Sequence, residues 1–140
     1  MGRSYMVAAA ATLAALVAGT AYAQAGGTIA MNDLQWREMI PGVSFAPAYG
    51  DWEAGAHGKY ARIMHGAEVP LHTHSAGYHA VMVSGRMTNI FDGDARAEIG
   101  PGDYFTIDTG QLHAHDCVSE EPCLFYTHSD GLWDIAVPEG

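Results

Sequence analysis

Four histidines in the middle of this 140-residue sequence are spaced in a way that could hold a metal ion. His72 and His74 are separated by a single residue, and alternate residues of a β-strand face the same side, so both imidazoles can point into one cavity. His79 follows five residues later, and His113 lies beyond a predicted hairpin. Imidazole is the commonest protein ligand for divalent transition metals near neutral pH. The spacing therefore indicates a site for one divalent transition metal.

Glycines at regular distances frame these histidines. Gly66 precedes the first histidine by six residues, and Gly85 follows His79 by six residues. A second segment, residues 102–113, reads GDYFTIDTGQLH and ends on the fourth histidine. A single His-x-His pair would be weak evidence, whereas two glycine-framed blocks in this order are a specific signal.

At these residues the sequence resembles the cupin superfamily, over roughly residues 57–130. Residues 66–85 are similar to the first cupin motif and residues 102–113 to the second. There are two departures: His79 stands where the family usually has a glutamate ligand, and Asp108 replaces a proline. The resemblance implies an all-β fold, a single-domain cupin-type β-barrel (double-stranded β-helix or jelly roll). It implies metal ligation by His72, His74, His79 and His113.

Four neutral imidazoles would leave the full charge of a divalent ion, which makes it a stronger Lewis acid than one bound to a carboxylate. Cupins with histidine-only sites include diketone- and thiol-cleaving dioxygenases and a zinc-containing polyketide cyclase. The resemblance thus implies a small-molecule metalloenzyme, dioxygenase-like, using iron, zinc, copper, manganese or nickel. The alternative is a non-catalytic exported module that binds a metal or ligand. Residues 36–49 also resemble uncharacterised cupins related to the cupin domain of a zinc-binding anti-sigma factor.

Three further polar residues are candidates for supporting the metal or contacting a substrate. His115 shares the strand face of His113, so it either supports the ligands or fills the barrel. Tyr60 and Arg62 alternate on the strand before the first motif and could bind an anionic group inside the barrel. The alternative for this pair is packing plus a salt bridge. The other histidines have no motif support and are interpreted as surface or pocket-lining residues: His57, His65 and His128.

Cys117 and Cys123 flank a stretch that suits a hairpin loop. Residues at the two ends of such a loop can come within disulfide distance, and export to an oxidising compartment favours the bond. A thiolate metal site is the alternative, but the spacing is not typical of a zinc knuckle. We therefore predict a disulfide that braces the strand carrying His113 and His115.

The first 23 residues have the features of a signal peptide. A basic start at Arg3 precedes an apolar run at residues 6–18, and Ala21 and Ala23 supply the small residues that signal peptidase reads. The apolar run is shorter than the about 20 residues of a membrane span, so no stable membrane anchor is expected. An uncleaved anchor is the alternative. The protein is predicted to be exported, either periplasmic or secreted.

Composition and local patterning describe the rest of the chain. Sixteen acidic residues against six basic ones give a formal net charge of −10, which argues against nucleic acid or an anionic membrane as a partner and suits a cationic ligand such as a metal ion. The small-molecule ligand or substrate is implied by the resemblance. A homodimer is left open.

Residues 33–40 suit one helical turn or a short edge strand. Alternation between glycine-rich turns predicts strands at 43–49, 59–65, 78–83, 86–91, 95–99, 104–107, 113–118 and 124–128. The predicted division is signal peptide 1–23, leader and edge strands 24–56, barrel 57–130 and C-terminal tail 131–140.

Overall fold

The computed structural model describes residues 26–139, so the predicted signal peptide lies outside the described residues. Within that range a single 3₁₀ turn, η1 (Met31–Asp33), precedes nine strands. No helix in this part of the chain is long and apolar enough to cross a membrane. The strands are β1 (Arg37–Ile40), β2 (Val43–Gly50), β3 (His57–Ile63), β4 (Tyr78–Ser84), β5 (Met87–Phe91), β6 (Asp94–Ile99), β7 (Tyr104–Ile107), β8 (His113–Cys117) and β9 (Cys123–Ser129).

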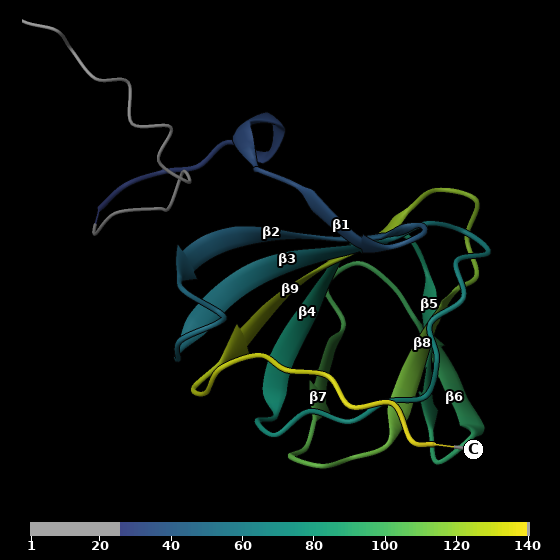
Figure 1. The fold of residues 1–140 in the computed structure, drawn as a ribbon. Coiled ribbons are helices and arrows are strands. Elements are labelled where there is room, and N and C mark those ends of the chain that lie inside the picture. The colour runs from purple at the N-terminus through teal and green to yellow at the C-terminus, as the bar shows by residue number, and fades with distance from the viewer. Residues whose placement is uncertain (1–25, 140) are drawn as a thin grey trace, which may run out of the picture.

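The strands form two antiparallel sheets. The larger has six strands in the order β1-β2-β3-β9-β4-β7, and the smaller has three in the order β6-β5-β8. Figure 1 shows the larger sheet curving over one side of the molecule, with β5, β6 and β8 standing opposite its far end. The predicted all-β jelly-roll architecture is confirmed. Because β2 pairs with β3 along its whole length, the barrel includes strands that lie before residue 57.

Cross-strand register places the apolar side chains on one inner face. Partners in an antiparallel ladder share a face of the sheet, so Ile63 lies beside both Val43 and Cys123. Removing such apolar surface from water stabilises the fold by about 25 cal/mol per Å². The buried core consists of Val43, Ala61, Ile63, Ala80, Met82, Met87, Phe105, Ile107, Cys117, Cys123 and Phe125.

Two turns follow directly from their sequences. Asp92 and Gly93 both have positive φ, 51° and 88°, and join β5 to β6. This backbone conformation matches the right-handed twist of the two strands, and Asp-Gly is the residue pair that adopts it most readily. The segment 33–40, predicted as one helical turn or an edge strand, contains the edge strand β1, and η1 ends at its first residue, Asp33. Gly42, at a φ of 78°, then turns the chain into β2.

The predicted disulfide is present between Cys117 and Cys123. It links the end of β8 in the smaller sheet to the start of β9 in the larger one. Both cysteines are fully buried against the core. The bond therefore ties together the two sheets next to the strand that begins with His113.

Replacing both cysteines by alanine should lower the free energy of unfolding by about 2 kcal/mol, because the closed loop is short and restricts the unfolded chain only modestly. Urea unfolding followed by tryptophan fluorescence measures the difference. Metal content should stay at the wild-type level, since neither sulfur belongs to the histidine cluster. Identical unfolding midpoints for the oxidised wild type and the variant would contradict a stabilising role for the bond.

Candidate metal centre

Three of the predicted histidines come together inside the barrel. His72 and His74 lie on the segment between β3 and β4, and His113 is the first residue of β8. His72 and His113 are joined by two backbone hydrogen bonds, of 2.9 and 3.0 Å, which hold the two segments side by side. One ligand atom from each of the three rings lies within 4.8 Å of the others. All three side chains are buried, so the distances between their ligand atoms and their burial both suit a single metal ion.

Each of these rings is oriented by the backbone. In every case the Nδ1–H donates a hydrogen bond to a main-chain carbonyl, which fixes the tautomer and leaves the lone pair on Nε2. The Nε2 atoms are therefore the ones available to a metal. The acceptors are the carbonyl of Pro70 for His72 at 2.8 Å, of Gln111 for His113 at 2.8 Å, and of Asp134 for His74.

The ligand atom of His113 has no partner in the protein. Its Nε2 is buried and makes no hydrogen bond within the described residues. A buried polar atom without a partner is unfavourable and uncommon in folded proteins. A metal ion bound between the three rings would supply that missing partner.

Burial also sets the protonation state of the cluster. Desolvation lowers the pKa of His74 and of His113 to about 4, and it lowers the pKa of His72 below its usual 6.5. All three imidazoles are therefore neutral at pH 7, which is the form that binds a metal. The group contains no carboxylate, so any bound divalent ion would keep its full positive charge.

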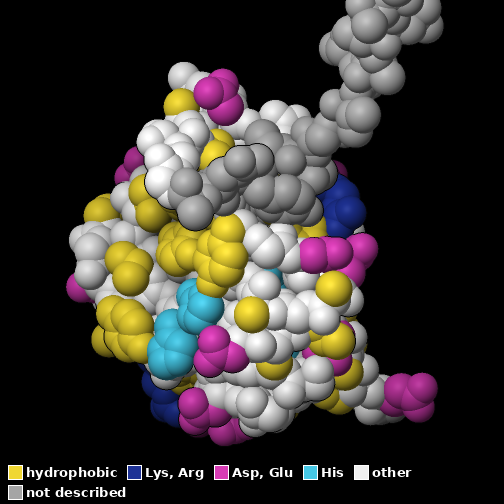
Figure 2. All heavy atoms as spheres, turned by 90° about the vertical axis from the view of Figure 1, so that its left-hand side faces the viewer, with side chains coloured by type: hydrophobic (Ala, Val, Ile, Leu, Met, Phe, Trp, Pro, Cys, Tyr) yellow, Lys and Arg dark blue, Asp and Glu magenta, His cyan; other side chains and the backbone are white. Residues whose placement is uncertain are grey.

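The fourth predicted ligand, His79, does not join this group. It lies exposed on the outer face of β4, where its Nδ1 is hydrogen-bonded to the hydroxyl of Tyr104. Its cross-strand partner is His128, which is also on the outer face. Figure 2, which faces this end of the sheet, shows histidine side chains at the surface beside acidic and hydrophobic ones. The prediction that His79 lies with the other three is wrong, because the inward residues of β4 are Tyr78, Ala80 and Met82, and a shift of one residue reverses the face.

Tyr78 occupies the place that the sequence prediction gave to its neighbour. It points inward, with its ring centroid 5.7 Å from that of His74 and 6.2 Å from that of His113. Desolvation raises the pKa of Tyr78 well above its usual range, so the side chain remains a neutral phenol. The signal was present in the sequence: three residues separate His74 from Tyr78, and six separate Tyr78 from Gly85, so Tyr78 also fits the glycine framing.

His115 lies next to His113, at a ring-centroid separation of 5.3 Å, and both of its nitrogens are hydrogen-bonded. Its Nδ1–H donates to Oδ1 of Asn89 at 2.7 Å, so its Nε2 accepts the hydroxyl proton of Tyr78 at 2.8 Å. Desolvation lowers the pKa of His115 well below 6.5. His115 therefore holds Tyr78 in place, and no free nitrogen is left for a metal.

Tyr60 and Arg62 also face away from the cavity. The guanidinium of Arg62 lies 4.2 Å from the ring centroid of Trp36, and the ring of Tyr60 packs against Tyr126 at 5.3 Å. The inward residues of β3 are the odd-numbered ones, and Ala61 and Ile63 among them belong to the core. The prediction that this pair binds an anion inside the barrel is wrong, and packing on the outer face is what the structure shows.

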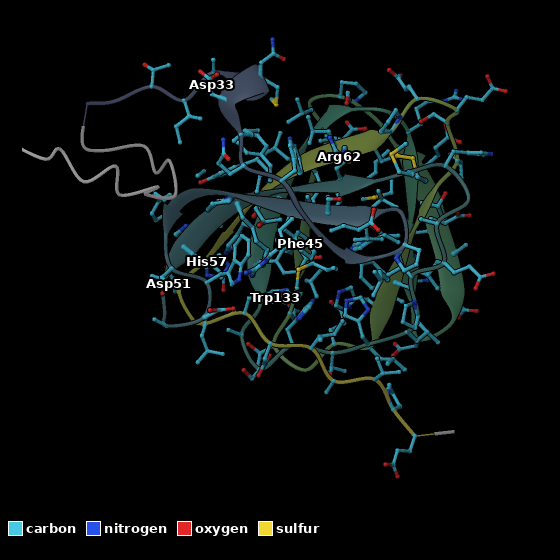
Figure 3. The ribbon with its side chains drawn as sticks, turned by 45° about the horizontal axis from the view of Figure 1, so that its top comes forward. Asp33, Phe45, Asp51, His57, Arg62 and Trp133 are labelled. Atoms are coloured by element: carbon cyan, nitrogen blue, oxygen red, sulfur yellow. A yellow bond between two sulfur atoms is a disulfide. The ribbon has the colours of Figure 1, made fainter. Side chains whose placement is uncertain are left out.

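The charged side chain that does enter the cavity from β3 is that of Lys59, which no sequence motif marks. Its side chain is 3% exposed, and its strand neighbours on the same face are His57 and Ala61. Figure 3 shows His57, Phe45 and Trp133 gathered under the larger sheet, with Arg62 on its other side. The cavity has a volume of about 310 Å³ and mostly apolar walls. Its polar lining consists of Lys59, His72, His74, Tyr78, His115 and Thr127.

The C-terminal segment, predicted as a tail, closes one side of this site. Ala136 forms an isolated antiparallel bridge with Thr73, between the two first-motif histidines. Asp134 accepts the Nδ1–H of His74 at its main-chain carbonyl, and its carboxylate accepts the backbone N–H of Ser75 at 2.8 Å. Residues 133, 135 and 137 line the cavity. The segment therefore orients a candidate ligand and walls the pocket.

An antiparallel double-sheet barrel with three inward histidines beside an apolar cavity is the arrangement of a cupin. The sequence model of the ChrR cupin-like domain matches residues 24–132, and the chain belongs to this family. No curated protein sequence matches the chain significantly.

Solved structures show the same fold at low sequence identity. The polyketide cyclase RemF from Streptomyces resistomycificus is 15% identical, with a TM-score of 0.68 over 81% of this chain and 85% of its own. The DMSP lyase DddQ from Ruegeria pomeroyi is 19% identical, with a TM-score of 0.63 over 76% of this chain and 63% of its own. A salicylate 1,2-dioxygenase from Pseudoaminobacter salicylatoxidans is 15% identical, with a TM-score of 0.56 over 66% of this chain and 28% of its own.

Proposed function

We propose that the protein is an exported cupin that binds one divalent transition metal through His72, His74 and His113 and acts on a small molecule, as a dioxygenase-type metalloenzyme. The observation that carries the metal site is the buried, unpartnered Nε2 of His113 within a group of three neutral imidazoles. Export is supported by the signal-like leader and by the disulfide, which persists in oxidising compartments.

The ligand set favours some ions over others. Imidazole suits iron, copper, zinc and nickel, whereas manganese prefers carboxylate oxygen, which this group lacks. A divalent ion held by three neutral rings would supply Lewis-acid or oxygen-activating chemistry at the cavity wall. Because His72 and His74 both line the cavity, a small molecule bound there would lie beside the ion.

The chain's own residues would bind and orient that molecule. The apolar walls exclude water and accept a hydrophobic body, as in most small-molecule sites. Tyr78 remains a neutral phenol and donates a hydrogen bond to Nε2 of His115, whose ring is anchored on Asn89. These two hydrogen bonds fix the polar side of the cavity next to the three histidines. Among the structural neighbours, a salicylate 1,2-dioxygenase binds gentisate, which is the kind of small aromatic ligand that such a site accommodates.

A second candidate function is a non-catalytic metal- or ligand-binding module. It is favoured by the protonation states at the site: the three histidines, His115 and Tyr78 all have pKa values shifted away from neutrality by burial. None of these groups is therefore poised to exchange a proton near pH 7. Chemistry at the histidine end of the cavity would therefore have to be metal-centred.

An exchangeable metal position distinguishes the two functions. In cobalt-substituted protein, azide should shift the visible absorption bands, because a three-ligand site leaves a position open to the cavity. The iron form should consume oxygen with at least one member of a panel of diketones, thiols and aromatic diols. A His79→Ala variant is the matched control and should behave as wild type. Absorption bands unchanged by azide, together with no oxygen uptake by the iron and copper forms, would favour the binding module.

A further inference from the structure

Lys59 has an unusual environment within the cavity. Its Nζ lies 4.4 Å from the ring centroid of Trp133, 5.0 Å from that of Phe45 and 5.6 Å from that of Trp52. The side chain is almost completely buried. Lysine is rarely buried without a charged partner, so this position needs a physical explanation.

The hydrogen-bonding capacity of this amine is mostly unused. Its one polar partner in the described part of the chain is Nε2 of His57, at 3.4 Å. His57 donates its Nδ1–H to the carbonyl of Gly55 at 2.9 Å, so Nε2 carries the lone pair. An ammonium group has three N–H donors, and no carboxylate in residues 26–139 forms an ion pair with Lys59. When Lys59 is protonated, two of these donors therefore have no acceptor among the described residues.

Three aromatic faces partly compensate a cation at this place, because each ring presents its negative face to it. They do not replace an acceptor, and desolvation still lowers the pKa of Lys59 to about 6. An incoming anionic group would supply both the hydrogen-bond acceptors and the negative charge that the protonated amine lacks in this cavity. In a cavity with mostly apolar walls, such an unmatched donor favours ligands that carry an acceptor and a negative charge.

Trp133 connects this amine to the candidate metal site. Its ring centroid lies 4.4 Å from Nζ of Lys59 and 6.0 Å from the ring of His74. One aromatic ring system therefore separates the lysine from the histidines. A ligand of similar size, lying along Trp133, would reach both.

We propose that Lys59 is the specificity residue for a carboxylate on an aromatic substrate whose apolar body fills the cavity between Lys59 and the three histidines. The inference rests on the proposed function for the histidine end of the cavity. Carboxylate binding at Lys59 can be tested without a metal. A negative result there would therefore not disprove metal binding by the histidines, and the reverse also holds.

The test compares 2-naphthoate with its neutral counterpart 2-naphthamide by isothermal titration calorimetry on the chelator-treated full-length protein. Wild type should bind the carboxylate at least tenfold more tightly than the amide. Lys59→Met should lose at least tenfold in affinity for 2-naphthoate and keep its affinity for the amide. Arg62→Met is the matched control: it removes a cation from the same strand, but on the outer face, and should change neither affinity.

Three results would overturn the proposal. The first is equal 2-naphthoate affinity in wild type and Lys59→Met while the variant remains folded by circular dichroism. The second is carboxylate binding that appears only in cobalt-loaded protein, which would assign the carboxylate to the metal. The third is equal affinity of wild type for 2-naphthoate and 2-naphthamide. If in that case borohydride also traps 2-naphthaldehyde on Lys59, the amine would be assigned to imine formation instead.

Discussion

A variant with alanine at both His72 and His74 is expected to lose stoichiometric metal binding. The two substitutions remove two of the three imidazoles in the cluster and leave His113 alone. Mutating residues that merely orient a ligand typically weakens metal binding by 10–100-fold, so removing two ligands should exceed about 100-fold. The metal binds the folded state, and at 100 times its dissociation constant it adds about 2.7 kcal/mol to stability. The variant should therefore also lose the thermal stabilisation that added metal gives to wild type.

Metal content by mass spectrometry and thermal unfolding with and without added zinc measure both effects. His79→Ala is the control, because it removes a histidine from the same stretch of sequence but from the outer face of β4. It should keep one metal ion per chain and the full shift in unfolding temperature. Stoichiometric metal in the double variant would place the site elsewhere. Loss of metal in His79→Ala alone would return that histidine to the ligand set.

Several features could be predicted from the sequence because their signals are local. The Asp92-Gly93 pair determines its own backbone conformation, so the β5–β6 hairpin follows from two residues. His72 and His74 reach one cavity because they are two residues apart, and the second motif places His113 opposite them. The disulfide between Cys117 and Cys123 could likewise be predicted, since it closes a short loop whose ends must approach each other.

The wrong predictions for His79, Tyr60 and Arg62 have one physical cause: the sequence does not show which face of a strand points into the barrel. On β4 and β3 polar and aromatic residues occupy both faces, so composition alone does not say which set points inward. Register against β2 and β9 decides it, and a shift of one residue exchanges His79 for Tyr78. In the same way the inward residue of β3 is Lys59 rather than Tyr60 or Arg62, although lysine is ordinarily exposed.

Contacts distant in sequence could not be predicted at all. Trp133 and Asp134 come from the segment after the last strand, yet one packs on the lysine and the other orients His74. Neither residue belongs to a recognisable motif. Their roles depend on how the C-terminal segment returns across the barrel mouth, where Ala136 bridges to Thr73.

The buried amine of Lys59 should also make stability depend on pH in a way that Lys59→Met removes. Its pKa is about 6 in the folded protein, against 10.5 for an ordinary lysine. Between those values the unfolded chain carries a proton that the folded chain does not, so unfolding takes up a proton and the free energy of unfolding rises with pH. This stability is lost as the pH falls from 10.5 towards about 6. One proton corresponds to a slope of about 1.4 kcal/mol per pH unit.

Urea unfolding of metal-free wild type and Lys59→Met at pH 7.5, 8.0 and 8.5 isolates this slope, because the carboxylates are ionised and the histidines are neutral in both proteins over this range. We expect the variant to be the more stable protein at neutral pH, by roughly 1–3 kcal/mol, since methionine fills the aromatic enclosure without an unmatched donor. The advantage should shrink as the pH rises. Arg62→Met, whose cation lies over Trp36 on the outer face, should follow the wild-type profile. Parallel profiles for wild type and Lys59→Met would mean that Lys59 stays protonated in the fold, with its charge stabilised by Trp133, Phe45 and Trp52.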